Sequence, residues 1–231
     1  MVSIIEVTDK AQLRRFVDYP NELYKDVPQF VPATYGDDLS DWDRSKNPAF
    51  EYCDARCWLA MRNGEIVGRI GAIHSRKAND KWGANRLRFT QVDFIDDPEV
   101  SSALFRTVEA WAKELDCTAV HGPLGFTDMD REGMLVEGFD RRSCFFTYYN
   151  YPYYIDHMAA LGYVKDVDWI EELITVPEDE ATIQDLRLRS QAPPPAHSRG
   201  QEPPVLSAPA QAVFRAGQPG LRAAVRHGGS L

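Results

Sequence analysis

Acidic, glycine and tyrosine residues are concentrated in residues 121–163. This stretch contains the carboxylates Asp128, Glu132 and Glu137, and tyrosines surround Asn150. Glycine lets a backbone turn sharply or approach a ligand closely. A long irregular segment inside a compact domain is usually functional or disordered, and such a high aromatic content argues against disorder. We therefore predict that the stretch lines a binding or catalytic site, with packing alone as the alternative.

The residue types that bind metals do not show a ligand spacing. Cys53 and Cys57 stand four residues apart without a second pair nearby, and Cys117 and Cys144 are isolated. The acids of residues 121–163 also lack the regular spacing of a carboxylate metal loop. We expect reduced cysteines, as in a cytoplasmic protein, and no metal ion.

Charge is distributed unevenly along the chain. The formal net charge is −9, and residues 181–231 carry six arginines against two acids. Residues 1–180 then hold 20 Lys and Arg against 33 Asp and Glu, a formal charge of −13. This acidic body argues against nucleic acid as a partner, since phosphate binding needs a basic surface. No charged leader and no apolar run near about 18 residues is found, so we expect a cytoplasmic protein that does not enter a membrane.

Several elements that would position such a site follow from local patterns. Asn63-Gly64 predicts a hairpin turn, because both central positions of a type I′ turn need positive φ. Apolar residues in 87–95 change from odd to even positions, which predicts a β-bulge or a strand covered on both faces. Asp97 and Pro98 suit the start of a helix. The other expected strands are 2–7, 57–61, 66–73, 118–121 and one within 164–176. We also expect one helix that begins after Thr8 or Asp9 and another over residues 152–161.

The composition changes after residue 180. The remaining segment has seven prolines and no lysine, tyrosine or tryptophan. Such a segment buries too little apolar surface to offset the entropy lost on ordering. We expect a folded domain over residues 1–178 and a disordered Pro/Ala/Arg/Gly-rich tail over 179–231. One hypothesis for the tail is out-of-frame translation after a truncation.

The expected element order and two motifs resemble the GNAT superfamily of CoA-dependent N-acyltransferases. The order is strand, helices, hairpin, long strand, helix, strand, helix, strand, and the two motifs lie at 63–68 and 158–163. A group of bacterial GNAT-like proteins is more similar still. The motifs that carry this similarity are Asn47-Pro48, Gly122-Pro123, 138–140 and 149–154.

The resemblance covers roughly residues 1–176 and implies an α/β fold with a mostly antiparallel central mixed sheet flanked by helices. It also implies a chain truncated at its C-terminal end, since members of the group look longer. The implied activity is transfer of an acyl group, such as acetyl, from acetyl-CoA or another acyl-CoA to an amine or amino-acid-like small molecule. The donor would lie against a splayed strand and the following helix N-terminus. Its implied contacts are Val92, Phe94, Val100, Ser101 and Ser102.

Acyl transfer needs a base for the amine and an acid for the departing thiolate. On the resemblance, Asp93 is a candidate base, and Tyr153 and Tyr154 are candidate acids, with aromatic packing as the alternative for both tyrosines. The candidate substrate residues share an acidic or amide side chain, and carboxylates attract an ammonium group. They are Asp128, Glu132, Glu137 and Asn150.

Two departures from the superfamily pattern favour other functions. The loop 96–101 has no glycine and three acids, and Pro98 lacks an N–H donor. Met158 stands where the superfamily often has a tyrosine acid. These features favour a GNAT-fold binding or regulatory module without CoA activity. The tail favours an inactive truncated fragment, and the sequence does not indicate an oligomeric state.

Overall fold

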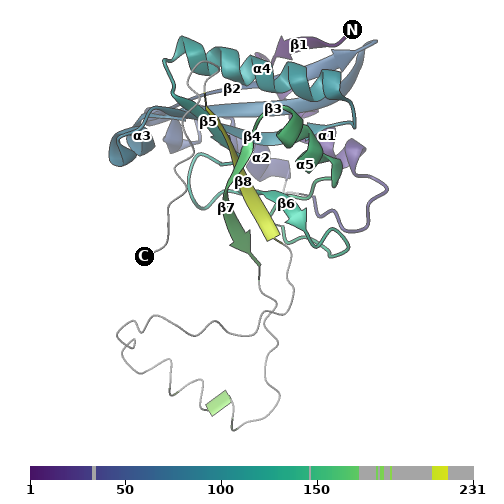
Figure 1. Cartoon of the computed structure of the whole chain (residues 1–231), viewed down its shortest axis with the longest axis vertical. Helices are drawn as coiled ribbons and strands as arrows, with labels where there is room; N and C mark the ends of the chain where they lie inside the picture. Colours follow the sequence, from purple (N-terminus) through teal and green to yellow (C-terminus); the bar gives the residue numbers. More distant parts are fainter. Residues whose placement is uncertain are drawn as a thin grey trace.

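A mixed sheet organises the fold of this protein, which a computed structural model describes for residues 1–32, 35–145, 147–171 and 210–217 and for positions 181, 183, 184 and 188 (Figure 1). The strand order is β1-β2-β3-β4-β5-β8-β6, and β7 pairs with β8. Among these pairs only β4 and β5 run parallel. The strands are β1 (Ser3–Glu6), β2 (Cys53–Arg62), β3 (Glu65–Ser75), β4 (Arg86–Phe94), β5 (Ala119–Gly122), β6 (Met134–Glu137), β7 (Val164–Ile170) and β8 (Ala210–Gly217).

Helices cover both faces of the sheet. One apolar cluster joins α4 to β2, β3 and β4 through side chains such as Trp58, Ile70 and Leu104. Another joins α1 to the opposite face of β2 through Phe16 and Leu59. The expected α/β fold with a mostly antiparallel sheet and flanking helices is therefore confirmed. The helices are α1 (Lys10–Leu23), α2 (Tyr35–Asp41), α3 (Arg76–Trp82), α4 (Pro98–Glu114) and α5 (Tyr153–Ala160), with a 3-10 turn at Pro48–Glu51.

The local predictions around β3 and β4 are confirmed. Asn63 and Gly64 have φ values of 51° and 86° and connect β2 to β3 as a tight turn. The register between β3 and β4 shifts between Arg69 and Gly71, and Gln91 opposite this shift has φ of 42°. The bulge is therefore present, and the second half of β4 is also buried on both faces.

Strand β5 pairs with only the first part of β4. Their register covers Arg86 to Arg88 on β4 and Ala119 to His121 on β5. The end of β4, from Thr90 to Phe94, therefore faces α5 and the irregular segments rather than a neighbouring strand on that side. This opening is where a site can form.

The structure describes residues 210–217, which lie within the segment that we expect to be a disordered tail. These residues form β8, which lies between β5 and β6 and also pairs with β7 (Figure 1). The sequence did not predict this strand, because the expectation of disorder was based on the composition of the whole segment. Most other residues of 179–231 lie outside the described part, so the division at 178 stays a prediction. No described helix combines the length and apolar character needed to cross a bilayer.

Gly68 allows α4 to pack closely on β3. A Cβ at this position would lie 2.9 Å from Leu104 Cδ1 and 3.0 Å from Val100 Cγ1. We expect Gly68→Ala to lower the free energy of unfolding by about 1–3 kcal/mol, because the helix must move away from the sheet. Chemical denaturation checks this value. Gly36→Ala is the control, since its Cβ meets nothing within 4 Å; an equal loss in both variants would contradict the packing argument.

Candidate functional site

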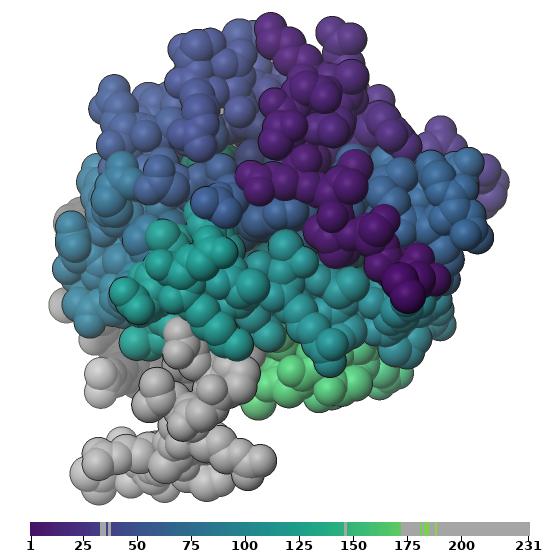
Figure 2. All heavy atoms as spheres, turned by 90° about the horizontal axis from the view of Figure 1, so that it is seen from above, coloured from purple at the N-terminus to yellow at the C-terminus, as the bar shows by residue number. Residues whose placement is uncertain are grey.

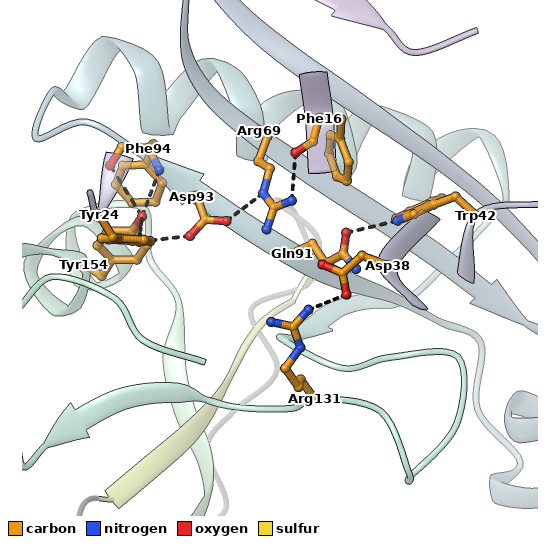
Figure 3. A network of polar contacts seen from close by, with 10 residues as sticks. All are labelled: Phe16, Tyr24, Asp38, Trp42, Arg69, Gln91, Asp93, Phe94, Arg131 and Tyr154. Atoms are coloured by element: carbon orange, nitrogen blue, oxygen red, sulfur yellow. Dashed lines mark hydrogen bonds and ion pairs between the residues drawn. The ribbon is translucent and has the colours of Figure 1, made fainter. Parts of the chain in front are cut away.

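A buried ion pair lies at the centre of the candidate site, at the end of β4 (Figure 3). Asp93 Oδ2 accepts a hydrogen bond from Arg69 Nε at 2.6 Å, and the two side chains are 6% and 2% exposed. Arg69 also donates from Nη1 to the carbonyl oxygen of Phe16, at 2.8 Å. The pair thus joins β4, β3 and α1. Charges this deeply buried persist only when partners satisfy them.

Two tyrosine hydroxyls continue the network from Asp93 towards α5. Tyr24 donates to Asp93 Oδ1 at 2.9 Å, and its oxygen lies 2.9 Å from the Tyr154 hydroxyl. The Tyr154 hydroxyl in turn accepts from Phe94 N at 2.8 Å. Burial raises the pKa of both tyrosines well above the usual value. Both hydroxyls therefore keep their protons at neutral pH and can act as donors.

Tyr153 and Tyr154 hold both polar groups of Phe94. Tyr153 donates to the Phe94 carbonyl oxygen at 2.6 Å, while the Phe94 N–H is bound by Tyr154. The Tyr154 ring also stacks on the Phe94 ring with centroids 4.1 Å apart. The two candidate acids and the candidate contact Phe94 are thus brought together. Arg69 and Tyr24 were missed in the sequence, although an arginine between apolar β3 residues was a signal of a buried partner.

Two cavities adjoin this network on the α1 and α2 side. The smaller one, about 20 Å³, is lined by Arg69, Asp93, Asp38, Arg131 and Tyr148. The larger one, about 190 Å³, shares Asp38, Arg131 and Tyr148 and extends along the bulged part of β4. Arg131 Nη2 donates to Asp38 Oδ1 at 2.6 Å (Figure 3), and its guanidinium lies 5.0 Å from the Tyr148 ring centroid. Residues between Gly125 and Tyr149 therefore line these cavities, and a binding or catalytic role for residues 121–163 stays a prediction.

The start of α4 does not fit a pyrophosphate. The N–H groups of Val100 and Ser101 already donate to the Asp97 carbonyl oxygen, at 3.1 and 3.2 Å. The Glu99 N–H donates to the Asp97 side chain at 2.8 Å. Arg62, the cation paired with these acids, binds Asp97 and Glu99 at 2.7 and 2.8 Å. The N-terminal segment lies beside α4 (Figure 2), and Val2 N donates to Glu99 at 2.9 Å.

A serine, a histidine and an aspartate are hydrogen-bonded next to this helix start. Ser101 Oγ lies 2.7 Å from His157 Nδ1, and His157 Nε2 lies 2.9 Å from Asp96 Oδ1. Ser101 is 1% exposed, and its hydroxyl lies within hydrogen-bond distance of both His157 Nδ1 and the carbonyl oxygen of Pro98. The arrangement joins α4 to α5 and holds the loop between β4 and α4. Ser102, the remaining predicted donor contact, is half-buried within α4.

The predicted substrate residues are not gathered at the cavities. Asn150 is buried, and its side chain bonds both the N–H and the carbonyl oxygen of Leu135, at 2.7 and 3.1 Å. Asp128 and Glu137 are exposed. Glu132 is half-buried, and burial raises its pKa to about 7, opposed by Arg88. Their roles towards a substrate stay predictions. No group of three potential metal ligands is found within the described ranges.

Comparison of structures shows which fold this is. The chain is similar to a polyamine N-acetyltransferase from Drosophila melanogaster, with a TM-score of 0.50 and 12% identity over 94% of this chain and 100% of that one. It is also similar to a putative acetyltransferase from Acinetobacter baylyi, with a TM-score of 0.51 and 10% identity over 94% of this chain and 92% of that one. The chain therefore has the fold of GNAT acetyltransferases.

Comparison of sequences finds two curated relatives. Protein YghO of Escherichia coli is 33% identical over 160 residues, which is 69% of this chain and 41% of that protein. The bacterial ceramide synthase of Caulobacter vibrioides is 29% identical over 168 residues, which is 72% of this chain and 44% of that protein. The chain thus spans less than half the length of these relatives. No protein-family model matches it.

Glu132 makes the stability of the protein depend on pH. Because the folded-state pKa of about 7 lies above the ordinary value of 4.5, the folded state binds this proton more tightly. The contribution of Glu132 to the free energy of unfolding is then fully present below about pH 4.5, and it is lost as the pH rises through about 7. In the wild type we expect the free energy of unfolding to fall by on the order of 1 kcal/mol over this range, a figure that allows for screening of the partly exposed side chain. Glu132→Gln should remove this fall.

Denaturation at about pH 5 and about pH 8 measures this difference. The exposed carboxylate Glu137 supplies the control, and Glu137→Gln should keep the wild-type dependence on pH. An unchanged pH dependence in Glu132→Gln would contradict the assignment.

Proposed function

We propose that this chain carries an N-acyltransferase site, which joins an acyl group from acyl-CoA to a small-molecule amine and so forms an amide. The GNAT fold supports the proposal, because proteins of known structure with this fold include a polyamine N-acetyltransferase. The similarity to a ceramide synthase also supports amide formation, since ceramides are amides. Fold alone does not fix an activity, so the residues of the site must supply the chemistry.

The observation that carries the proposal is the chain of hydrogen bonds from Asp93 to Tyr154. It begins at a carboxylate that lines the cavity and ends at a hydroxyl between β4 and α5. Acyl transfer to an amine needs a proton acceptor on one side of the reacting carbonyl and a proton donor on the other. This network supplies both types of group within one connected path through Tyr24.

The amine nitrogen attacks the acyl carbon, a C–N bond forms, and the carbon–sulfur bond of the thioester breaks. Asp93 accepts the proton that the amine loses, and Tyr154 supplies the proton that the thiolate takes up. Transfer through the Tyr24 hydroxyl returns both residues to their starting states. Burial raises the pKa of both tyrosines, so both hydroxyls are protonated at neutral pH when the reaction begins.

A second candidate function is a GNAT-fold binding module that does not react with acyl-CoA. It is favoured by the α4 start, where the N–H groups of Val100 and Ser101 have protein partners and three acids gather. It is also favoured by Phe94, whose N–H and carbonyl oxygen are both bound by tyrosines. The two functions differ in whether the protein turns over an acyl donor.

An acyl-transfer assay tests the proposal directly. We expect the full chain to release free CoA from acetyl-CoA or a longer acyl-CoA when a mixture of amines is present, and mass spectrometry should detect the matching amides. If the folded protein releases no CoA from any donor, the binding module is favoured. Release of CoA without any amide would contradict transfer to an amine.

Removal of one hydroxyl tests the role of Tyr154. We expect Tyr154→Phe to lower the transfer rate by about 10²–10⁴-fold, because the thiolate then lacks its proton donor. Tyr163→Phe is the matched control, since Tyr163 is also buried but bonds Glu109 away from the site. Circular dichroism and thermal melting establish that both variants fold. Equal rates in the two variants would rule out this role for Tyr154.

A further inference from the structure

Arg69 and Arg131 approach the smaller cavity from different elements. Arg69 comes from β3, and Arg131 comes from the loop before β6. Both guanidinium groups line this cavity, and Figure 3 shows them on either side of the space beside Asp93 and Asp38. Their side chains are 2% and 14% exposed, so little water screens them.

Each arginine uses only part of its donors on the protein. Arg69 binds Asp93 through Nε and Phe16 through Nη1, while Arg131 binds Asp38 through Nη2. A guanidinium carries five N–H donors. Within the described part of the chain, no hydrogen bond is found for Arg69 Nη2 or for Nη1 and Nε of Arg131. These N–H groups are therefore available as donors to a ligand, because both arginines line the cavity.

The two carboxylates of this cavity are already paired. Asp38 and Asp93 each accept a short bond from one arginine, so the four charges sum to zero. The sequence favoured an acidic surface that attracts an ammonium group. The structure instead places spare N–H donors at the cavity, and these groups bind oxygen atoms that accept hydrogen bonds.

We infer that this cavity binds an oxygen-bearing group of the acceptor, either a carboxylate or a hydroxyl, between Arg69 and Arg131. The inference rests on the proposed function, because that function identifies the ligand as the amine that accepts the acyl group. This cavity of about 20 Å³ has room for about one water-sized group and is also lined by Asp93, so an oxygen group inside it and an amine at Asp93 must lie within a few bonds of each other. The acceptor class is therefore an amine with an oxygen-bearing substituent on the amine-bearing carbon, and its apolar remainder extends into the adjoining cavity of about 190 Å³.

Three matched amines test this inference by binding alone. Heptylamine has no oxygen, 2-amino-1-octanol adds a hydroxymethyl group to the same carbon, and 2-aminooctanoic acid adds a carboxylate there. Saturation-transfer NMR or calorimetry with the full chain measures their affinities without any acyl transfer. We expect at least one oxygen-bearing amine to bind about 10-fold to 100-fold more tightly than heptylamine. Preference for the acid identifies a carboxylate, and preference for the alcohol identifies a hydroxyl.

Arg131→Lys connects the preference to the site. The variant keeps the positive charge beside Asp38 but loses the fork of donors, so the ratio of the affinities for the preferred amine and for heptylamine should fall towards one. Arg76→Lys is the control, because Arg76 forms an exposed pair with Asp54. Equal binding of all three amines, no binding of any, or a preference that survives in Arg131→Lys would overturn the inference. Because the readout is binding, a protein that fails to transfer acyl groups can still support it.

Discussion

The buried pair of Arg69 and Asp93 is the interaction on which the site depends. Neither charge could stay in this interior alone, because removing an ion from water costs several kcal/mol unless partners compensate. The compensation comes from different parts of the chain: the α1 carbonyl of Phe16, the hydroxyl of Tyr24 and the bulged β4. Elements distant in sequence are thereby fixed around one cavity, even though a buried ion pair by itself adds little net stability.

The bulge explains how β4 serves this arrangement. The register shift opposite Gln91 changes which side chains face each side of the sheet, so Asp93 faces Arg69 while Phe94 turns its ring towards α5. Because β5 leaves β4 after Arg88, the polar backbone groups near Phe94 need other partners. Tyr153 and Tyr154 provide them. The site therefore follows from how the fold satisfies an unpaired strand edge.

Local rules were sufficient for the parts of this fold that short segments determine. The Asn63-Gly64 turn, the Asp97 cap of α4 and the β4 bulge follow from residue types within a few positions. The bond from Tyr24 to Asp93 could not be predicted, because Tyr24 lies 69 residues away and no short pattern records such a distance. Strand β8 was missed for a related reason, since its pairing with β5 and β7 is not visible in its composition.

The site suits an acyl thioester and an amine, whereas the start of α4 does not suit a pyrophosphate. Calorimetric titration of acetyl-CoA and of S-acetylpantetheine, which lacks the nucleotide and its phosphates, tests both parts. We predict that both ligands bind, with dissociation constants within about threefold of each other. Acetyl-CoA that binds more than about tenfold more tightly would contradict the account of α4, and a folded protein that binds neither ligand would contradict acyl transfer.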